Sequence, residues 1–237
     1  MFKNKKVIIF DMDGTLIDSI GIWNEIDLEL INKIRNIEFD NVDIGIQRDN
    51  ILAKSSGEIY LEYCKFLKEK YKSILAPEEI LKLRHSIAEE LRNKIEYKKD
   101  ADKVLKLLKK TGYKLALATT TTKEALNAYN NQNKNMMEKV KIYDIFDLIY
   151  SKEDIKEKKP NPEIHYKILN TLNIEPEECI IIEDSLIGVQ AAKNAKIEVI
   201  TMYDKYSDLN RDEINKLTDY KFNNFTELLE VIEEEVK

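Results

Sequence analysis

The chain has 237 residues, of which 43% are apolar and 35% are charged. This balance predicts a folded protein with one main domain, or one main and one smaller domain, and excludes disorder over most of the chain. The 38 basic and 44 acidic residues leave a formal charge of −6, which argues against nucleic acid as the main partner. The longest apolar runs hold only four residues, so we expect no membrane span and no signal peptide. The sequence thus indicates a cytoplasmic protein, in which Cys64 and Cys179 would be free thiols.

The first predicted element is a buried strand over Val7–Phe10, which lies between lysines and Asp11. From about residue 22 to residue 95, apolar side chains recur at helical spacing instead. This block contains no convincing strand. It indicates a separate all-helical domain, which we place at residues 18–97.

Strands and helices alternate after Asp100. Further strands are predicted over residues 113–118, 146–150, 179–182 and 197–202, with helices between them and a closing helix over 225–236. Continuous apolar strands separated by amphipathic helices are typical of a parallel sheet covered on both faces. We therefore expect an α/β, Rossmann-like core domain formed by residues 1–17 and 98–237, with the helical domain inserted into it.

Acidic and hydroxyl side chains follow three of the predicted strands: Asp11 and Asp13, then Thr119 and Thr120, then Glu183 and Asp184. Ligands of open parallel sheets bind at the carboxyl ends of the strands, so these side chains should meet at one edge. A cluster of carboxylates needs a compensating cation, and ligands that are all oxygen favour Mg²⁺ over zinc. A threonine hydroxyl and the charge of Lys159, in Lys159-Pro160-Asn161-Pro162, would complete a site suited to phosphoryl transfer.

Four segments resemble, in order, the four motifs of the haloacid dehalogenase superfamily, and together they cover nearly the whole chain. They are Asp11-Met12-Asp13-Gly14-Thr15-Leu16, Ala116-Leu117-Ala118-Thr119, Lys159-Pro160-Asn161-Pro162 and Ile182-Glu183-Asp184-Ser185 with Gly188. The stretch from Glu175 to Ala192 is similar to the phosphatase and β-phosphoglucomutase branch, whose helical domain forms a cap. The resemblance implies a hydrolase with a Rossmann-like core and a helical cap.

The resemblance also implies a role for each motif residue. Asp11 would attack phosphorus and form an aspartyl-phosphate intermediate, while Asp13 would serve as acid and then as base. The hydroxyl of Thr119 and the backbone N–H of Thr120 would bind phosphoryl oxygens, and Lys159 would stabilise their charge.

For the metal, the resemblance implies that Mg²⁺ is held by the Asp11 carboxylate, the Asp13 backbone carbonyl and Asp184. Glu183 would be a further ligand or a neighbour of the ligands. The implied activity is a Mg²⁺-dependent phosphatase that hydrolyses a small phosphomonoester, and we expect a monomer or a weak dimer.

Two residues of the helical block are candidates for contact with the substrate. The segment Gly45-Ile46-Gln47-Arg48 resembles the cap loop that faces the active site in this branch. There Arg48 would meet a second anionic group of the substrate, or it is an ordinary surface arginine. Trp23 stands where mutases of this branch commonly have a histidine, which weakens the mutase interpretation. It either faces the substrate or packs in the core of the cap.

Three alternatives remain open. A phosphomutase would use the same core residues but pass the phosphoryl group to a second substrate hydroxyl. A dehalogenase would use Asp11 but would need neither Asp13 nor a metal. A non-enzymatic receiver module also phosphorylates an aspartate beside acidic residues, although such a module is far shorter and has no inserted domain.

Overall fold

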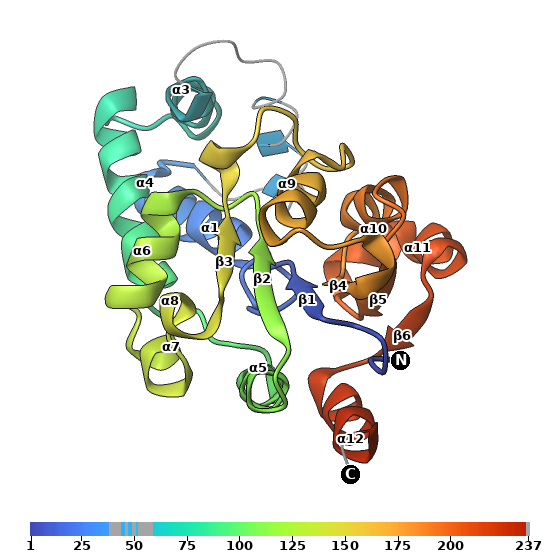
Figure 1. The fold of residues 1–237 in the computed structure, drawn as a ribbon. Coiled ribbons are helices and arrows are strands. Elements are labelled where there is room, and N and C mark those ends of the chain that lie inside the picture. The colour runs from blue at the N-terminus through green and yellow to red at the C-terminus, as the bar shows by residue number, and fades with distance from the viewer. Residues whose placement is uncertain (38–43, 46, 49–50, 52–58, 236–237) are drawn as a thin grey trace. The chain divides into compact units, whose positions relative to one another are not determined.

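The computed structural model describes residues 1–37, 44–45, 47–48, 51 and 59–235 (Figure 1). The chain divides into two compact units, which we call the core unit (residues 1–20 and 95–237) and the helical unit (residues 21–94). The core domain predicted from the sequence consists of residues 1–17 and 98–237. In the described part of the chain, no helix combines the length and the apolar character that crossing a bilayer requires.

Six parallel strands form the described sheet of the core unit, in the order β3-β2-β1-β4-β5-β6. They are β1 (Val7–Phe10), β2 (Lys114–Ala118), β3 (Leu148–Tyr150), β4 (Cys179–Glu183), β5 (Glu198–Met202) and β6 (Tyr220–Phe222). The predicted α/β fold with a parallel sheet is therefore confirmed. In the central strand, Phe10 lies opposite Leu117 of β2 and Ile182 of β4, so these three strands end at the same level.

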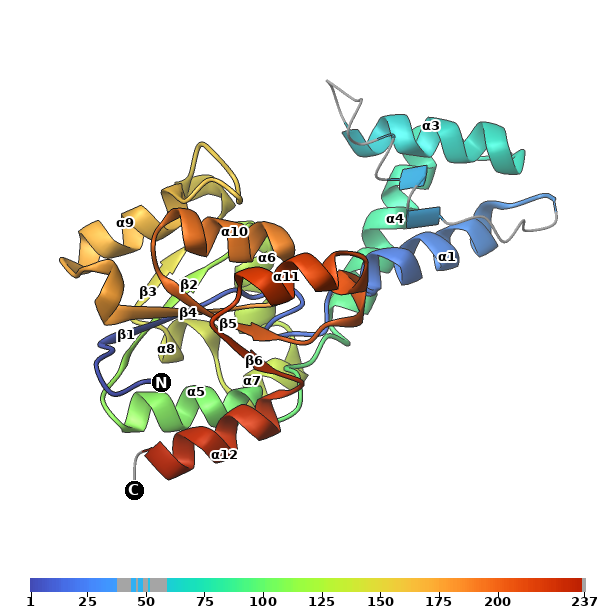
Figure 2. The ribbon, with the colours of Figure 1, turned by 90° about the vertical axis from the view of Figure 1, so that its right-hand side faces the viewer.

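Helices cover both faces of the sheet (Figure 2). One face carries α9 (Glu163–Leu172), α10 (Leu186–Asn194) and α11 (Arg211–Leu217), and the other carries α5 (Ala101–Lys110) and α12 (Phe225–Glu235). The core unit also contains α6 (Lys123–Asn131), α7 (Lys134–Lys139), α8 (Ile142–Ile145) and short 3₁₀ helices at Lys152–Asp154, Pro176–Glu178 and Lys205–Asn210. Coverage of both faces explains why the central strands consist almost entirely of apolar residues.

Side chains of the inner strands and of α9 and α10 form a continuous apolar core. Its fully buried members include Val7, Ile9, Ile164, Ile168, Ile181, Val189 and Val199. Burial of each such side chain stabilises the fold by about 1.5–3 kcal/mol. The strand ends that carry the polar residues are therefore anchored in a rigid layer.

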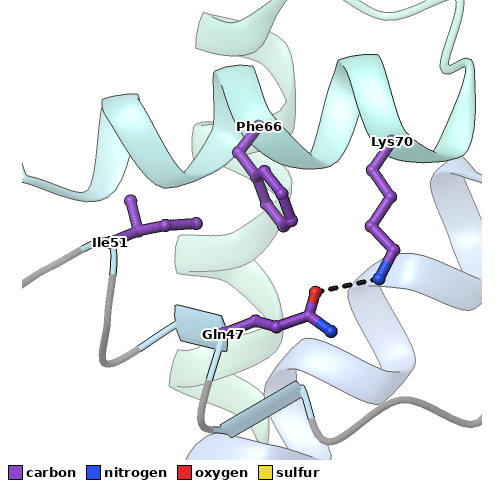
Figure 3. A pocket seen from close by; sticks show the side chains of 4 residues that line it. All are labelled: Gln47, Ile51, Phe66 and Lys70. Carbon is purple, nitrogen blue, oxygen red and sulfur yellow. Dashed lines mark hydrogen bonds between the residues drawn. The ribbon is translucent and has the colours of Figure 1, made fainter.

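The described helices of the helical unit are α1 (Ile22–Ile34), α3 (Ile59–Tyr71) and α4 (Pro77–Arg92). Their apolar faces enclose a separate core that includes Ile26, Leu30, Tyr63, Leu67, Ile80 and Ile87. This unit contains a pocket of about 440 Å³. Figure 3 shows the side chains that line it, which are Gln47, Ile51, Phe66 and Lys70. Lys70 Nζ donates a hydrogen bond to Gln47 Oε1 at 2.8 Å.

Two details of the core unit differ from the sequence prediction. The strand expected over residues 146–150 begins only at Leu148, because the short helix α8 precedes it. Strand β6 was missed because it has three residues at the sheet edge, with Lys221 exposed, and therefore shows no continuous apolar run.

Candidate active site

The ends of β1, β2 and β4 bring the predicted site residues of the core unit together. Asp11 directly follows β1, and its backbone N–H donates to the carbonyl of Ile182 at 3.0 Å. Thr119 directly follows β2, and Glu183 is the last residue of β4. The register of the central strands therefore places the side chains of Asp11, Thr119 and Glu183 side by side at the carboxyl ends of these strands.

Asp11, Glu183 and Asp184 form a compact acidic cluster, in which carboxylate oxygens of all three lie within 4.8 Å of one another. Burial, with a contribution from the neighbouring carboxylates, raises the pKa of Asp11 well above its ordinary value although Lys159 opposes the shift. Burial and the charge of Glu183 raise the pKa of Asp184 to about 7. The cluster thus holds more negative charge than its surroundings stabilise.

Lys159 is the cation of this cluster. Its Nζ donates to Asp11 Oδ1 and to Glu183 Oε1, each at 2.6 Å, and only 4% of its side chain is exposed. Burial alone would lower the pKa of Lys159, but the charges of Asp11 and Glu183 raise it above its ordinary value. The lysine is therefore charged at neutral pH and holds the two carboxylates together.

The Glu183 carboxylate is held on both of its oxygens. Oε2 accepts from the backbone N–H groups of Asp184 and Ser185, at 2.9 and 3.0 Å, and from Ser185 Oγ at 3.0 Å. Oε1 accepts from Lys159. The backbone of Gly188, in the first turn of α10, packs so closely against this carboxylate that a Cβ there would lie 1.8 Å from Oε1. Glu183 is thus a fixed anchor for the strand end and for Lys159.

The Asp184 carboxylate is fully buried and held by hydroxyl groups. Thr15 Oγ1 donates to its Oδ1 at 2.6 Å, and Ser207 Oγ donates to Oδ2 at 3.5 Å. Gly14, whose φ is +84°, passes so close that a Cβ there would lie 2.7 Å from Asp184 Oδ2. Only glycine combines this backbone conformation with this approach.

Asp13 and the threonines that follow β2, at residues 119–122, complete the group of polar residues at the carboxyl ends of the strands. Ser19 Oγ donates to Asp13 Oδ1 at 2.6 Å, and the hydroxyl of Thr121 donates to Asp13 Oδ2. The buried hydroxyl of Thr119 accepts from the backbone N–H of Thr121 at 3.0 Å, while Thr120 is exposed. Ser19 and Thr121 could not be recognised from the sequence, since a hydroxyl residue in a turn is common and only the folded chain brings these two to Asp13.

The two candidates of the helical unit lie near a buried charge cluster of that unit. Arg48 Nη1 contacts Asp27 Oδ2 at 2.9 Å and Asn24 Oδ1 at 3.2 Å. Trp23 is 38% exposed, and its ring lies 5.9 Å from the guanidinium carbon of Arg84. A contact of Arg48 or Trp23 with a substrate stays a prediction.

The donor set of the acidic cluster fits a divalent cation. All of its side-chain ligands are carboxylate oxygens, which are hard donors of the kind that Mg²⁺ prefers. Burial raises the pKa values of Asp11 and Asp184, and a bound cation would supply positive charge that favours the ionised form of both carboxylates. An adjacent lysine and hydroxyl can bind the oxygens of an anionic substrate.

Comparisons with known proteins agree with this arrangement. Residues 8–202 match the family model of the haloacid dehalogenase-like hydrolases. A phosphoglycolate phosphatase of Aquifex aeolicus is 26% identical over 237 residues, which cover 98% of each chain. A phosphorylated carbohydrates phosphatase of Thermotoga maritima is 28% identical over 208 residues, which cover 82% of this chain and 83% of the relative.

A solved structure from Thermotoga maritima, described provisionally as a beta-phosphoglucomutase, is similar over almost the whole length. It is 25% identical, covers 97% of this chain and 99% of its own, and superposes with a TM-score of 0.73. The family match extends over most of the core unit, including all four motifs that carry the site residues. The chain therefore belongs to the haloacid dehalogenase-like hydrolase family.

Proposed function

We propose that this protein is a Mg²⁺-dependent phosphatase that hydrolyses a small phosphorylated metabolite through an aspartyl-phosphate intermediate. The observation that carries the proposal is the position of Asp11 at the end of the central strand, 2.6 Å from Lys159 and grouped with two further carboxylates. The relatives named as phosphatases of phosphoglycolate and of phosphorylated carbohydrates support the substrate class.

In the first step, a carboxylate oxygen of Asp11 attacks phosphorus while the bond to the ester oxygen breaks, and Asp13 gives its proton to that leaving oxygen. In the second step, Asp13 takes a proton from water as the water oxygen bonds to phosphorus. The acyl-phosphate bond then breaks, which restores the Asp11 carboxylate and releases inorganic phosphate. The Thr119 hydroxyl, the Thr120 N–H and Lys159 would hold the phosphoryl oxygens throughout.

Asp11, Asp184 and the backbone carbonyl of Asp13 would hold the metal, with Glu183 beside them as an anchor. Bound Mg²⁺ would neutralise part of the negative charge of the phosphoryl group. The helical unit would provide substrate selectivity, with Arg48 and Trp23 as the candidate contacts.

A phosphomutase is the second candidate, because the structural relative described as a beta-phosphoglucomutase shares the fold over nearly the whole chain. The two activities differ in the acceptor of the second step. Stoichiometric release of inorganic phosphate would support the phosphatase, whereas isomerisation of a sugar phosphate without phosphate release would support the mutase.

The test is phosphate release from a panel of phosphomonoesters, which includes phosphoglycolate, hexose phosphates and p-nitrophenyl phosphate, measured with MgCl₂ and with a chelator. Replacement of the nucleophile in Asp11→Asn should reduce turnover by about 10³-fold or more. Asp13→Asn should reduce it by about 10²- to 10⁴-fold, the usual contribution of general acid–base catalysis. Asp18→Asn is the matched control, because Asp18 is exposed and should retain full activity. Near wild-type activity of Asp11→Asn would refute the nucleophile.

A further inference from the structure

The carboxylate of Asp13 is held by two hydroxyl groups that come from different parts of the core unit. Ser19 lies in the segment after β1, which also contains Asp13, whereas Thr121 lies in the loop between β2 and α6. Each hydroxyl occupies a different oxygen of the carboxylate. The orientation of Asp13 is therefore set both by a residue close to it in the sequence and by a residue from a distant loop.

The position of Thr121 is itself fixed by its backbone. Its N–H donates to Thr119 Oγ1 at 3.0 Å, and its carbonyl accepts from the N–H of Lys152 at 3.1 Å. The next residue, Thr122, caps α6 by accepting from the N–H of Ala125 at 3.2 Å. The loop is thus tied down on both sides of the Thr121 side chain, so its hydroxyl is presented to Asp13 in a defined place.

A hydroxyl is suited to a group that releases a proton in one step and takes one up in the next. It can donate to a carboxylate and can accept from a carboxylic acid after rotation about its C–O bond. A cationic or amide N–H donor could serve only the carboxylate. An apolar side chain could serve neither form and would leave the oxygen without a partner.

We propose that Thr121 is a positioning residue that holds the carboxyl group of Asp13 in the orientation needed for proton transfer, a role that rests on the proposed phosphatase activity. While Asp13 carries its proton, the Thr121 hydroxyl holds one carboxyl oxygen in place, so that the O–H of Asp13 points at the leaving ester oxygen. When the proton passes to that oxygen and the P–O bond breaks, Thr121 donates to the new carboxylate. The same exchange runs backwards as Asp13 takes a proton from the attacking water.

The Thr121 backbone adds a second effect. Because its N–H occupies a lone pair of the Thr119 hydroxyl, that hydroxyl has its own hydrogen to donate to a phosphoryl oxygen. Substitution of the Thr121 side chain leaves this backbone bond in place. A change at the side chain therefore reports on Asp13 and not on phosphate binding.

The test compares two leaving groups, because an alkyl phosphate needs a proton on its leaving oxygen whereas p-nitrophenyl phosphate needs it far less. We would measure kcat/KM at saturating Mg²⁺ for p-nitrophenyl phosphate and for the alkyl phosphate that the wild type hydrolyses best. Thr121→Val should lose about 10- to 100-fold on the alkyl phosphate and about threefold or less on p-nitrophenyl phosphate. Thr121→Ser, which keeps the hydroxyl, should restore the wild-type ratio of the two substrates.

Thr122→Val is the matched control, because it removes a neighbouring hydroxyl that caps a helix. It should lower the melting temperature without changing the substrate ratio. Thr121→Ala removes the same hydroxyl as Thr121→Val with less bulk, and it takes the place of the valine variant if that variant does not fold.

Equal losses on both substrates, or a serine variant as impaired as the valine variant, would overturn the positioning role. A wild type that releases no phosphate from any ester with Mg²⁺ would overturn the proposed function, and the inference with it. An active wild type whose substrate ratio is unchanged in Thr121→Val would overturn the inference alone.

Discussion

Gly188→Ala adds a methyl group at the most crowded point behind the acidic cluster. The new Cβ would lie 1.8 Å from Glu183 Oε1, 1.9 Å from its carboxyl carbon and 2.3 Å from Oε2. To restore an ordinary contact of 3.4 Å, the nearest oxygen would have to move by about 1.6 Å. A movement of that size breaks hydrogen bonds to Lys159, Asp184 and Ser185, which are now 2.6 to 3.0 Å long.

The expected magnitude follows from these bonds. Hydrogen bonds to a charged group contribute about 1.5–3 kcal/mol each, although contributions within one network are not additive. Alanine in a helix interior is favoured over glycine by about 1 kcal/mol, which offsets part of the loss. Since the loss of one such bond already outweighs this offset, we expect a net destabilisation of at least about 2 kcal/mol, or a melting temperature lower by at least about 4–8 °C. Because Lys159 loses an anchor next to Asp11, kcat should fall by about 100-fold.

Thermal unfolding and steady-state turnover with Mg²⁺ measure the two effects separately. Gly112→Ala is the control: its Cβ would meet nothing within 4 Å, but its φ of +95° is unfavourable for alanine. It should lose about 1–2 kcal/mol of stability and keep its kcat. The shorter side chain in Glu183→Asp should partly relieve the clash, so the double variant with Gly188→Ala should lose less than the two single variants together. Wild-type stability and kcat in Gly188→Ala would refute the reasoning.

Three further predictions concern charge. Lys159→Met leaves Asp11 beside other buried carboxylates without its ion-pair partner, so unfolding free energy should fall by about 3–5 kcal/mol in denaturant titrations without metal; an unchanged midpoint would contradict this. Mg²⁺ at about 100 times its dissociation constant should stabilise the protein by about 2.7 kcal/mol, measured as a shift in thermal unfolding. The raised folded-state pKa of Asp184, about 7, stabilises the metal-free protein at low pH, and this contribution is lost as pH rises through about 7. The Mg²⁺ effect should therefore be larger at pH 7.5 than at pH 5.5, and equal shifts would count against the site. Asp27→Asn weakens the partner of Arg84 in the helical unit, so hydrogen exchange should become faster in α1 and α4 while the protection of the sheet is retained.

The sequence predicted the parts of the fold that depend on continuous apolar runs. The strands β1, β2, β4 and β5 are buried on both faces, so their composition alone indicates them. Strand β6 is short and partly exposed, and its pairing with β5 depends on the sheet that is already formed. Edge strands of this kind carry little signal of their own.

The candidate site likewise contains residues that could be predicted from the sequence and residues that could not. Asp11, Thr119 and Glu183 could be assigned to one edge because each ends a recognisable strand, and parallel strands present their carboxyl ends together. The contacts of Thr121 and Ser19 with Asp13 join residues whose spacing carries no pattern. The residues to which we assign the proposed chemistry could thus be predicted from the sequence, whereas the hydroxyls that hold Asp13 in place could not.

The charge of the site explains why these parts belong together. Among the described residues of the acidic cluster, full ionisation of the three carboxylates would leave two negative charges in a buried place, because Lys159 supplies a single positive charge. Burial is the main cause of the raised pKa values of Asp11 and Asp184, and the neighbouring carboxylates add to it. A divalent cation would balance this charge, whereas hydroxyl donors such as Thr15 can orient Asp184 but cannot neutralise it. Glu183 has a structural part in this arrangement. Both oxygens of its carboxylate are held by N–H and O–H groups, so it keeps Lys159 next to Asp11, the proposed nucleophile, at the end of the central strand.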